Sequence, residues 1–150
     1  MRPPVRLRTY RSTDFEALYE IDHACFPPGI SYGRGELAAF LTSPQSMTWV
    51  AEADDRPVGF VIADRENEEA AHIVTIDVIE GWRHRGVGSE LMKTAEDWTA
   101  RMGVQFVYLE TAEDNQLAQR FYISRGYKVF ERLANYYANG QAAWVMVKQI

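Results

Sequence analysis

The chain has 150 residues, of which 47% are hydrophobic and 25% charged, so it is long enough for one domain with a substantial core. Its net charge of −5 argues against a nucleic-acid partner, because such binders are usually basic. The single cysteine, Cys25, excludes an internal disulfide, and no apolar run is long enough to cross a membrane. We therefore expect one domain over residues 1–150, cytoplasmic, without a membrane partner, and monomeric or weakly dimeric.

Short strands and helices are predicted for the first half of the chain. Alternation after a proline pair indicates a strand, and apolar residues at helical spacing indicate a helix that the prolines after Phe26 end. A charged turn before Val58 separates two apolar runs and predicts a strand hairpin. The segments are strands over 5–10, 47–53 and 58–64, and helices over 15–26 and about 35–41.

The second half begins with an apolar, β-branched strand that ends at a glycine-containing turn. A helix follows and stops at Gly103, a further helix opens at Asn115 and stops at Gly126, and Asn139-Gly140 indicates a hairpin turn. The expected strands cover 71–78, 104–111, 127–130 and 142–148.

The order of elements is β-α-α-β-β-β-α-β-α-β-β. The helix between the strands over 71–78 and 104–111 makes a crossover connection, so these two strands should be parallel. The strands joined by short turns should be antiparallel. The sequence thus predicts an α/β (α+β) fold with a mixed, mostly antiparallel central sheet of about seven strands and helices on both faces.

The turn over residues 80–89 carries the clearest sign of ligand binding. Gly86 and Gly88 let an anion approach the backbone, and the free amides at the following helix start attract negative charge. The turn is not a Walker A loop, because no Gly-Lys-Ser/Thr follows the glycines. It is not a dinucleotide fingerprint either, because Leu91 stands where the third glycine would be. By itself the turn indicates an anion site.

Two motifs resemble those of the GNAT N-acetyltransferase superfamily. The spacing Arg83-x-x-Gly86-x-Gly88 is similar to its Q/R-x-x-G-x-G/A acetyl-CoA loop, and residues 115–127 resemble its second signature, N-x-x-A-x-x-F/L-Y-x-x-x-G-F/Y. The predicted order of elements is also the GNAT order. The resemblance implies a GNAT-like fold and acetyl-CoA as the donor. The residues expected to bind it are Ile76, Asp77, Val78, Arg83, His84, Arg85, Gly86, Val87, Gly88, Ser89, Asn115 and Tyr122.

Within this donor site the strand end should pair with the pantetheine arm like an added strand. A bulge near Val78 would free an N–H for the thioester oxygen. Tyr122 can protonate the departing thiolate, although it also suits a core position beside Phe121. Asn115 is expected to bond the pantetheine, to cap its helix, or both.

A narrower resemblance is to the RimI-type ribosomal-protein-alanine N-acetyltransferases and their protein Nα-acetyltransferase relatives. Cys25-Phe26-Pro27, Leu109-Glu110 and residues 135–146 carry it. It implies a peptide or protein N-terminus as acceptor, a ribosomal protein being one case. Tyr136 and Tyr137 would then hold the peptide backbone. Pro28-Gly29-Ile30 departs from the Pro-Trp-Ser of that group, in a loop that lines the acceptor site.

Proton transfer is assigned to two residues, Glu110 and Tyr122. Glu110 either takes the proton of the incoming ammonium, as the RimI-type match favours, or forms a salt bridge at the strand end. Asp77 is the second candidate for the base, and Tyr32 is a further candidate for the acceptor mouth. Cys25 is expected to pack in the core, so the amine should attack the thioester directly.

No metal is predicted, because the three histidines lack metal-ligand spacing. His23, His72 and His84 are interpreted as structural or surface residues. Two other functions stay open. One is the same transfer to a small amine such as an amino acid or a polyamine, and the other is a non-catalytic acyl-CoA-binding regulatory domain.

Overall fold

A mixed sheet of seven strands forms the centre of the computed structural model, which describes residues 4–150, so the first three residues of the expected domain lie outside it. The predicted order of strands and helices is confirmed. The strands are β1 (Arg6–Thr9), β2 (Ser46–Ala53), β3 (Arg56–Arg65), β4 (Ala70–Val78), β5 (Phe106–Ala112), β6 (Lys128–Leu133) and β7 (Ala143–Gln149). The helices are α1 (Phe15–Cys25), α2 (Arg34–Thr42), α3 (Val87–Arg101) and α4 (Gln116–Ser124), with short 3-10 turns η1 (Ser12–Asp14) and η2 (Glu80–Trp82).

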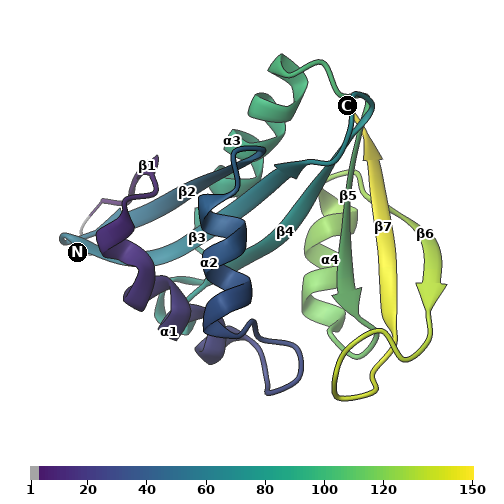
Figure 1. Cartoon of the computed structure of the whole chain (residues 1–150), viewed down its shortest axis with the longest axis horizontal. Helices are drawn as coiled ribbons and strands as arrows, with labels where there is room; N and C mark the ends of the chain where they lie inside the picture. The colour runs from purple at the N-terminus through teal and green to yellow at the C-terminus, as the bar shows by residue number, and fades with distance from the viewer. Residues whose placement is uncertain (1–3) are drawn as a thin grey trace.

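The strands lie in the order β1-β2-β3-β4-β5-β7-β6, and β4 with β5 is the parallel pair, as the crossover through α3 predicted. Their pairing covers only Ala70–His72 against Phe106–Tyr108. Beyond these residues the two strands diverge, which Figure 1 shows as a V between β4 and β5. The end of β4 therefore keeps β3 as its strand partner on one edge and, within residues 4–150, has no strand partner on the other.

Helices cover both faces of the sheet, as predicted. In Figure 1 α1 and α2 lie in front of it and α3 and α4 behind it. Leu18 and Leu37 bury the front helices against β2 and β3, and Leu91 and Met92 bury α3 against the other face. All four side chains are fully buried, and truncating such a leucine to alanine costs about 2–5 kcal/mol. The helices are thus held by apolar packing.

The β6–β7 connection is longer than the two-residue turn expected at Asn139-Gly140, because it spans residues 134–142. The Gly140 amide donates to the Tyr137 carbonyl at 2.8 Å, and Asn139 Oδ1 accepts from the Gln141 amide at 3.0 Å. Asn139-Gly140 therefore makes a turn inside a larger loop.

The bulge expected near Val78 lies elsewhere. The β3–β4 register changes between Ile62 and Ala63, which pair with Thr75 and Ile73 and leave Val74 without a partner. Val78 itself pairs regularly with Gly59. The expected position was wrong by four residues, because a bulge is set by the pairing of two strands rather than by one.

Candidate active site

The N-terminus of α3 is open to an anion. Gly86 is its N-cap residue with φ +84°, and no side chain caps the helix. A Cβ built at Gly86 would have no heavy atom within 4 Å, whereas one at Gly88 would lie 3.4 Å from the Phe121 ring. The first-turn amides are thus left for a ligand, and their dipole favours negative charge. A diphosphate fits this donor set.

The basic side chains of the turn are held partly by the backbone. Arg83 Nε donates to the Val78 carbonyl at 2.7 Å, and Arg83 Nη2 lies 3.6 Å from Cys25 Sγ. Arg85 Nε donates to the Gly81 carbonyl at 3.3 Å, while His84 and Ser89 are exposed. Arg83 thus links the turn to the end of β4 by a hydrogen bond. The backbone amides at the start of α3 are therefore better placed than the Arg83 side chain to bind an anion.

The strand end at Ile76, Asp77 and Val78 borders the V between β4 and β5. These residues pair with Val61, Phe60 and Gly59 of β3 along one edge only. Asp77 is buried, and Ile76 and Val78 are half-buried. The other edge is where an extended ligand arm could add itself as a strand.

Tyr122 lies on α4, and Asn115 is the N-cap residue of that helix. Tyr122 is 8% exposed, and its ring meets those of Phe121 and Tyr127 at 5.5 and 5.9 Å. Burial raises the pKa of the Tyr122 phenol, which therefore stays protonated at neutral pH and can donate a hydrogen bond. Asn115 Oδ1 accepts from the Ala118 amide at 3.2 Å, so Asn115 caps α4.

Glu110 lies at the centre of the predicted acceptor site. His72 Nε2 is 2.7 Å from Glu110 Oε1, and the Tyr136 hydroxyl donates to the same oxygen at 3.3 Å. The Tyr136 and Tyr137 rings meet edge to face at 4.9 Å. Burial, with the charge of Glu110, raises the pKa of Tyr136 to about 12. Tyr32 also interacts electrostatically with Glu110 and both tyrosines, so the structure brings these predicted residues together.

His72 is the site residue that the sequence interpretation missed. It pairs with Tyr108 across the parallel β4–β5 contact, and the two rings stack at 4.6 Å. Glu110 follows Tyr108 by two residues and so points to the same face of β5. Glu66 lies 3.9 Å from the other ring nitrogen of His72. Only the register of the parallel pair could have revealed this contact, because His72 and Glu110 are 38 positions apart.

The loop after α1 meets the β6–β7 loop at Gly29. The Ala138 amide donates to the Gly29 carbonyl at 3.1 Å. Gly29 has φ +90°, and a Cβ there would lie 2.7 Å from Asn139 Cβ. The Pro28-Gly29-Ile30 departure therefore has a structural reason, since this close contact requires glycine.

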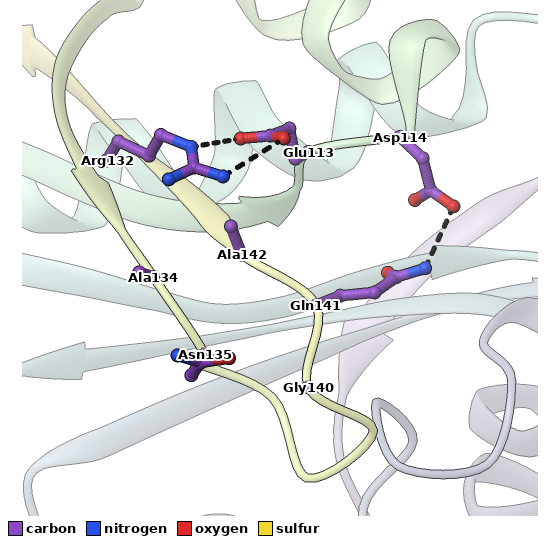
Figure 2. Close-up of a pocket in the computed structure, with 8 residues that line it drawn as sticks. All are labelled: Glu113, Asp114, Arg132, Ala134, Asn135, Gly140, Gln141 and Ala142. Atoms are coloured by element: carbon purple, nitrogen blue, oxygen red, sulfur yellow. Dashed lines mark hydrogen bonds and ion pairs between the residues drawn. The ribbon is translucent and has the colours of Figure 1, made fainter.

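A pocket of about 540 Å³ lies on another side of the β6–β7 loop. Figure 2 shows Arg132 directed at Glu113 and Gln141 directed at Asp114. Its lining residues are Glu113, Asp114, Arg132, Ala134, Asn135, Gly140, Gln141 and Ala142. None of the residues predicted for acetyl transfer lines it.

Two further properties concern the described residues alone. Within residues 4–150, no helix is both long and apolar enough to cross a membrane. In the same part of the chain, no three His, Cys, Asp or Glu side chains gather closely enough to hold a metal ion.

Comparisons with known proteins agree with this fold. A sequence model of the acetyltransferase (GNAT) family matches residues 15–127. An uncharacterised N-acetyltransferase of Methanocaldococcus jannaschii is 30% identical, covering 95% of this chain and 90% of its own. An N-alpha-acetyltransferase of Sulfurisphaera tokodaii is 27% identical, covering 94% and 90%. The crystal structure of Ard1 from Thermoplasma volcanium has a TM-score of 0.89 and 27% identity, covering 97% of each chain.

The fold, the open α3 amides and the family match define an acyltransferase that uses an acyl-CoA donor. The chain belongs to the GNAT family of acetyltransferases and is an acetyl-CoA-dependent N-acetyltransferase.

Proposed function

We propose that the protein acetylates the α-amino group of a peptide or protein N-terminus. The observation that carries this proposal is the Glu110 carboxylate, held by His72 at 2.7 Å and Tyr136 at 3.3 Å beside the open edge of β4. The N-alpha-acetyltransferase named among the relatives supports the same acceptor. An alanine-starting ribosomal-protein peptide is the particular acceptor that the RimI-type resemblance implies.

On the donor side, acetyl-CoA supplies a thioester activated for attack. The amides of Val87, Gly88 and Ser89 at the start of α3 would bind its diphosphate, with Arg85 and His84 adding positive charge at the turn. The free edge of Ile76–Val78 would hold the pantetheine arm. Asn115 is expected to keep its capping role, because its side-chain oxygen is already engaged.

On the acceptor side, the attacking amine must be neutral. An α-amino group has a pKa of about 7.7–8.0, so most of it is charged at pH 7. Glu110 would accept the ammonium proton, directly or through water, and His72 would orient the carboxylate. Tyr32, Tyr136 and Tyr137 would contact the peptide.

The reaction then needs one bond formed and one broken. The amine nitrogen attacks the thioester carbon, and the carbon–sulfur bond breaks to release the CoA thiolate. Tyr122 would donate its phenolic hydrogen to that sulfur, and the proton that the acylated nitrogen loses would return through water to the phenolate. Cys25 is unsuited to an acyl-enzyme route, because burial raises the pKa of its thiol to about 11 and keeps it protonated.

A peptide panel tests the acceptor. Peptides starting with alanine, serine or methionine are incubated with acetyl-CoA beside the same peptides with blocked N-termini, free amino acids and polyamines. We expect acetylation of free N-termini and none of blocked ones, read by mass spectrometry. Transfer only to small amines would contradict the proposal, and CoA binding without any transfer would favour a regulatory domain.

A further inference from the structure

Two carboxyl groups to which the proposed acetyl transfer assigns no proton step lie in the core. Asp22 of α1 is 0% exposed, and Asp77 of β4 is 1% exposed. Asp22 is near enough to Asp77 to help raise the pKa of the Asp77 carboxyl. They come from opposite layers of the fold, because α1 covers the sheet to which β4 belongs.

Each carboxyl is oriented by one outside donor. The Tyr32 amide donates to Asp22 Oδ2 at 2.7 Å, and the Thr75 hydroxyl donates to Asp77 Oδ1 at 2.5 Å. The remaining oxygens, Asp22 Oδ1 and Asp77 Oδ2, are fully buried and receive no N–H or O–H from the residues described. Two ionised carboxylates cannot donate to each other, whereas one proton held between them would supply the missing donor.

The surroundings of Asp77 oppose the ionisation of its carboxyl group. Burial, with the contact to Asp22, holds the pKa of Asp77 well above its usual range, and Arg83 opposes this only in part. Arg83 also donates to the Val78 carbonyl. The other ionisable groups that interact with the pair are Cys25 from α1, Tyr32 from the loop after α1, and Tyr122 from α4.

We propose that Asp22 and Asp77 share one proton and act as a positioning pair for the acceptor site. The pair holds the Tyr32 backbone, while the Tyr32 hydroxyl donates to the carbonyl of the bulged Val74 at 3.2 Å. Tyr32 is thus fixed at both ends against β4, beside Glu110. This inference rests on the N-acetyltransferase activity and concerns how the proposed acceptor is positioned.

Single asparagine variants test whether the two carboxyl groups share a proton or whether each is an independent buried acid. In Asp77→Asn, Thr75 can still donate to the amide oxygen while the amide nitrogen donates to Asp22. In Asp22→Asn, Tyr32 donates to the amide oxygen and the amide nitrogen faces Asp77. Each variant therefore replaces the shared proton by an N–H donor. We expect both to fold, and we expect Asp22→Asn to keep an acceptor KM within about threefold of wild type at pH 7.

The double variant Asp22→Asn/Asp77→Asn should behave differently. With both outside donors in place, two amide nitrogens face each other and neither has an acceptor. We expect a loss of melting temperature greater than the sum of the single effects, and an acceptor KM raised about tenfold. Asp55→Asn, in an exposed turn, is the matched control and should change neither quantity.

The pH dependence of stability gives a readout that does not need the acceptor. The native pair keeps a proton that the unfolded chain releases above the ordinary aspartate pKa. The native state therefore loses stability as the pH rises from there towards the raised pKa of the pair. Asparagine does not ionise, so each single variant lacks this loss. The melting temperature of the variant minus that of wild type at the same pH should therefore increase from pH 5 to pH 9.

Three results would overturn the proposal. These are single variants that fail to fold, a melting-temperature difference independent of pH, and a double variant no worse than the sum of its parts. If no amine is acetylated by the wild type, the proposed acceptor fails, while the melting temperatures still decide whether the proton is shared.

Discussion

His72 Nε2 lies 2.7 Å from Glu110 Oε1, and this contact joins β4 to β5 at the point where the two strands begin to diverge. Both side chains are 13% exposed, so water screens the interaction only in part. Because the Tyr136 hydroxyl approaches the same oxygen, the carboxylate is held from two elements. A carboxylate fixed in this way is suited to accept a proton from an amine.

Glu110→Gln should lower kcat/KM at pH 7 by about 100-fold, because an amide cannot accept the ammonium proton. Part of the rate should return up to pH 9, as more of the acceptor becomes neutral. His72→Asn should cause a smaller loss, about tenfold, since Tyr136 still contacts the carboxylate. Steady-state kinetics from pH 6 to 9, with CoA affinity from calorimetry as the control, measure both effects. Wild-type rates in Glu110→Gln would remove Glu110 from the mechanism.

Tyr122→Phe should lower kcat by about 10- to 100-fold while leaving the fold and the CoA affinity intact, because only the hydrogen-bond donor to the leaving sulfur is lost. Tyr127→Phe is the matched control from the same aromatic cluster. The Tyr127 hydroxyl donates to buried Glu96 at 2.8 Å, so its loss should cost about 1 kcal/mol of stability without slowing turnover. Equal turnover in the two variants would contradict the role of Tyr122.

Gly86→Ala should weaken CoA binding by about tenfold or more, because it adds a Cβ in open space at the N-cap of α3, where we expect the diphosphate to bind. Gly103→Ala tests whether backbone strain alone explains the result. The two glycines have φ +84° and +83°, and neither Cβ would meet an atom within 4 Å. Both variants should lose about 1 kcal/mol of stability. Calorimetry should find weaker CoA binding in Gly86→Ala only.

Gly29→Ala should displace the β6–β7 loop, since its Cβ would lie 2.7 Å from Asn139 Cβ. We expect the peptide KM to rise several-fold with CoA affinity unchanged, because Tyr136 and Tyr137 belong to that loop. Gly33→Ala is the control on the same segment, where the nearest atom, Glu36 Oε1, is 3.5 Å away. A peptide KM equal in the two variants would show that the loop contact does not shape the acceptor site.

Cys25→Ala should keep kcat within about twofold of wild type, because a thiol whose pKa is raised to about 11 is almost wholly protonated at neutral pH. Mass spectrometry of the wild type mixed with acetyl-CoA should find no acetylated Cys25. An inactive Cys25→Ala variant that still binds CoA would instead indicate an acyl-enzyme.

Parts of the site were predictable from neighbouring residues alone. The glycines at positions 86 and 88 indicated the anion site, and Asn115 indicated the start of α4, because turns and helix caps are formed by residues close together in the chain. The same local patterns, with the crossover rule for parallel strands, gave the order of elements and the one parallel pair. The length of the β6–β7 loop was not predictable in this way. Its turn at Asn139-Gly140 is formed by neighbouring residues, but the loop also contacts Gly29, which is far away in the sequence.

The sequence by itself determined the secondary structure, the position of the glycine turn and the residues able to carry protons, since these follow from propensity, periodicity and side-chain chemistry. Tertiary structure alone decided the contact of His72 with Glu110, the pairing of Asp22 with Asp77 and the bulge at Val74. Each of these three features depends on the register of paired strands or on how α1 packs against the sheet. A shift of one residue turns every strand side chain to the opposite face, and only the packing of the whole core fixes that choice.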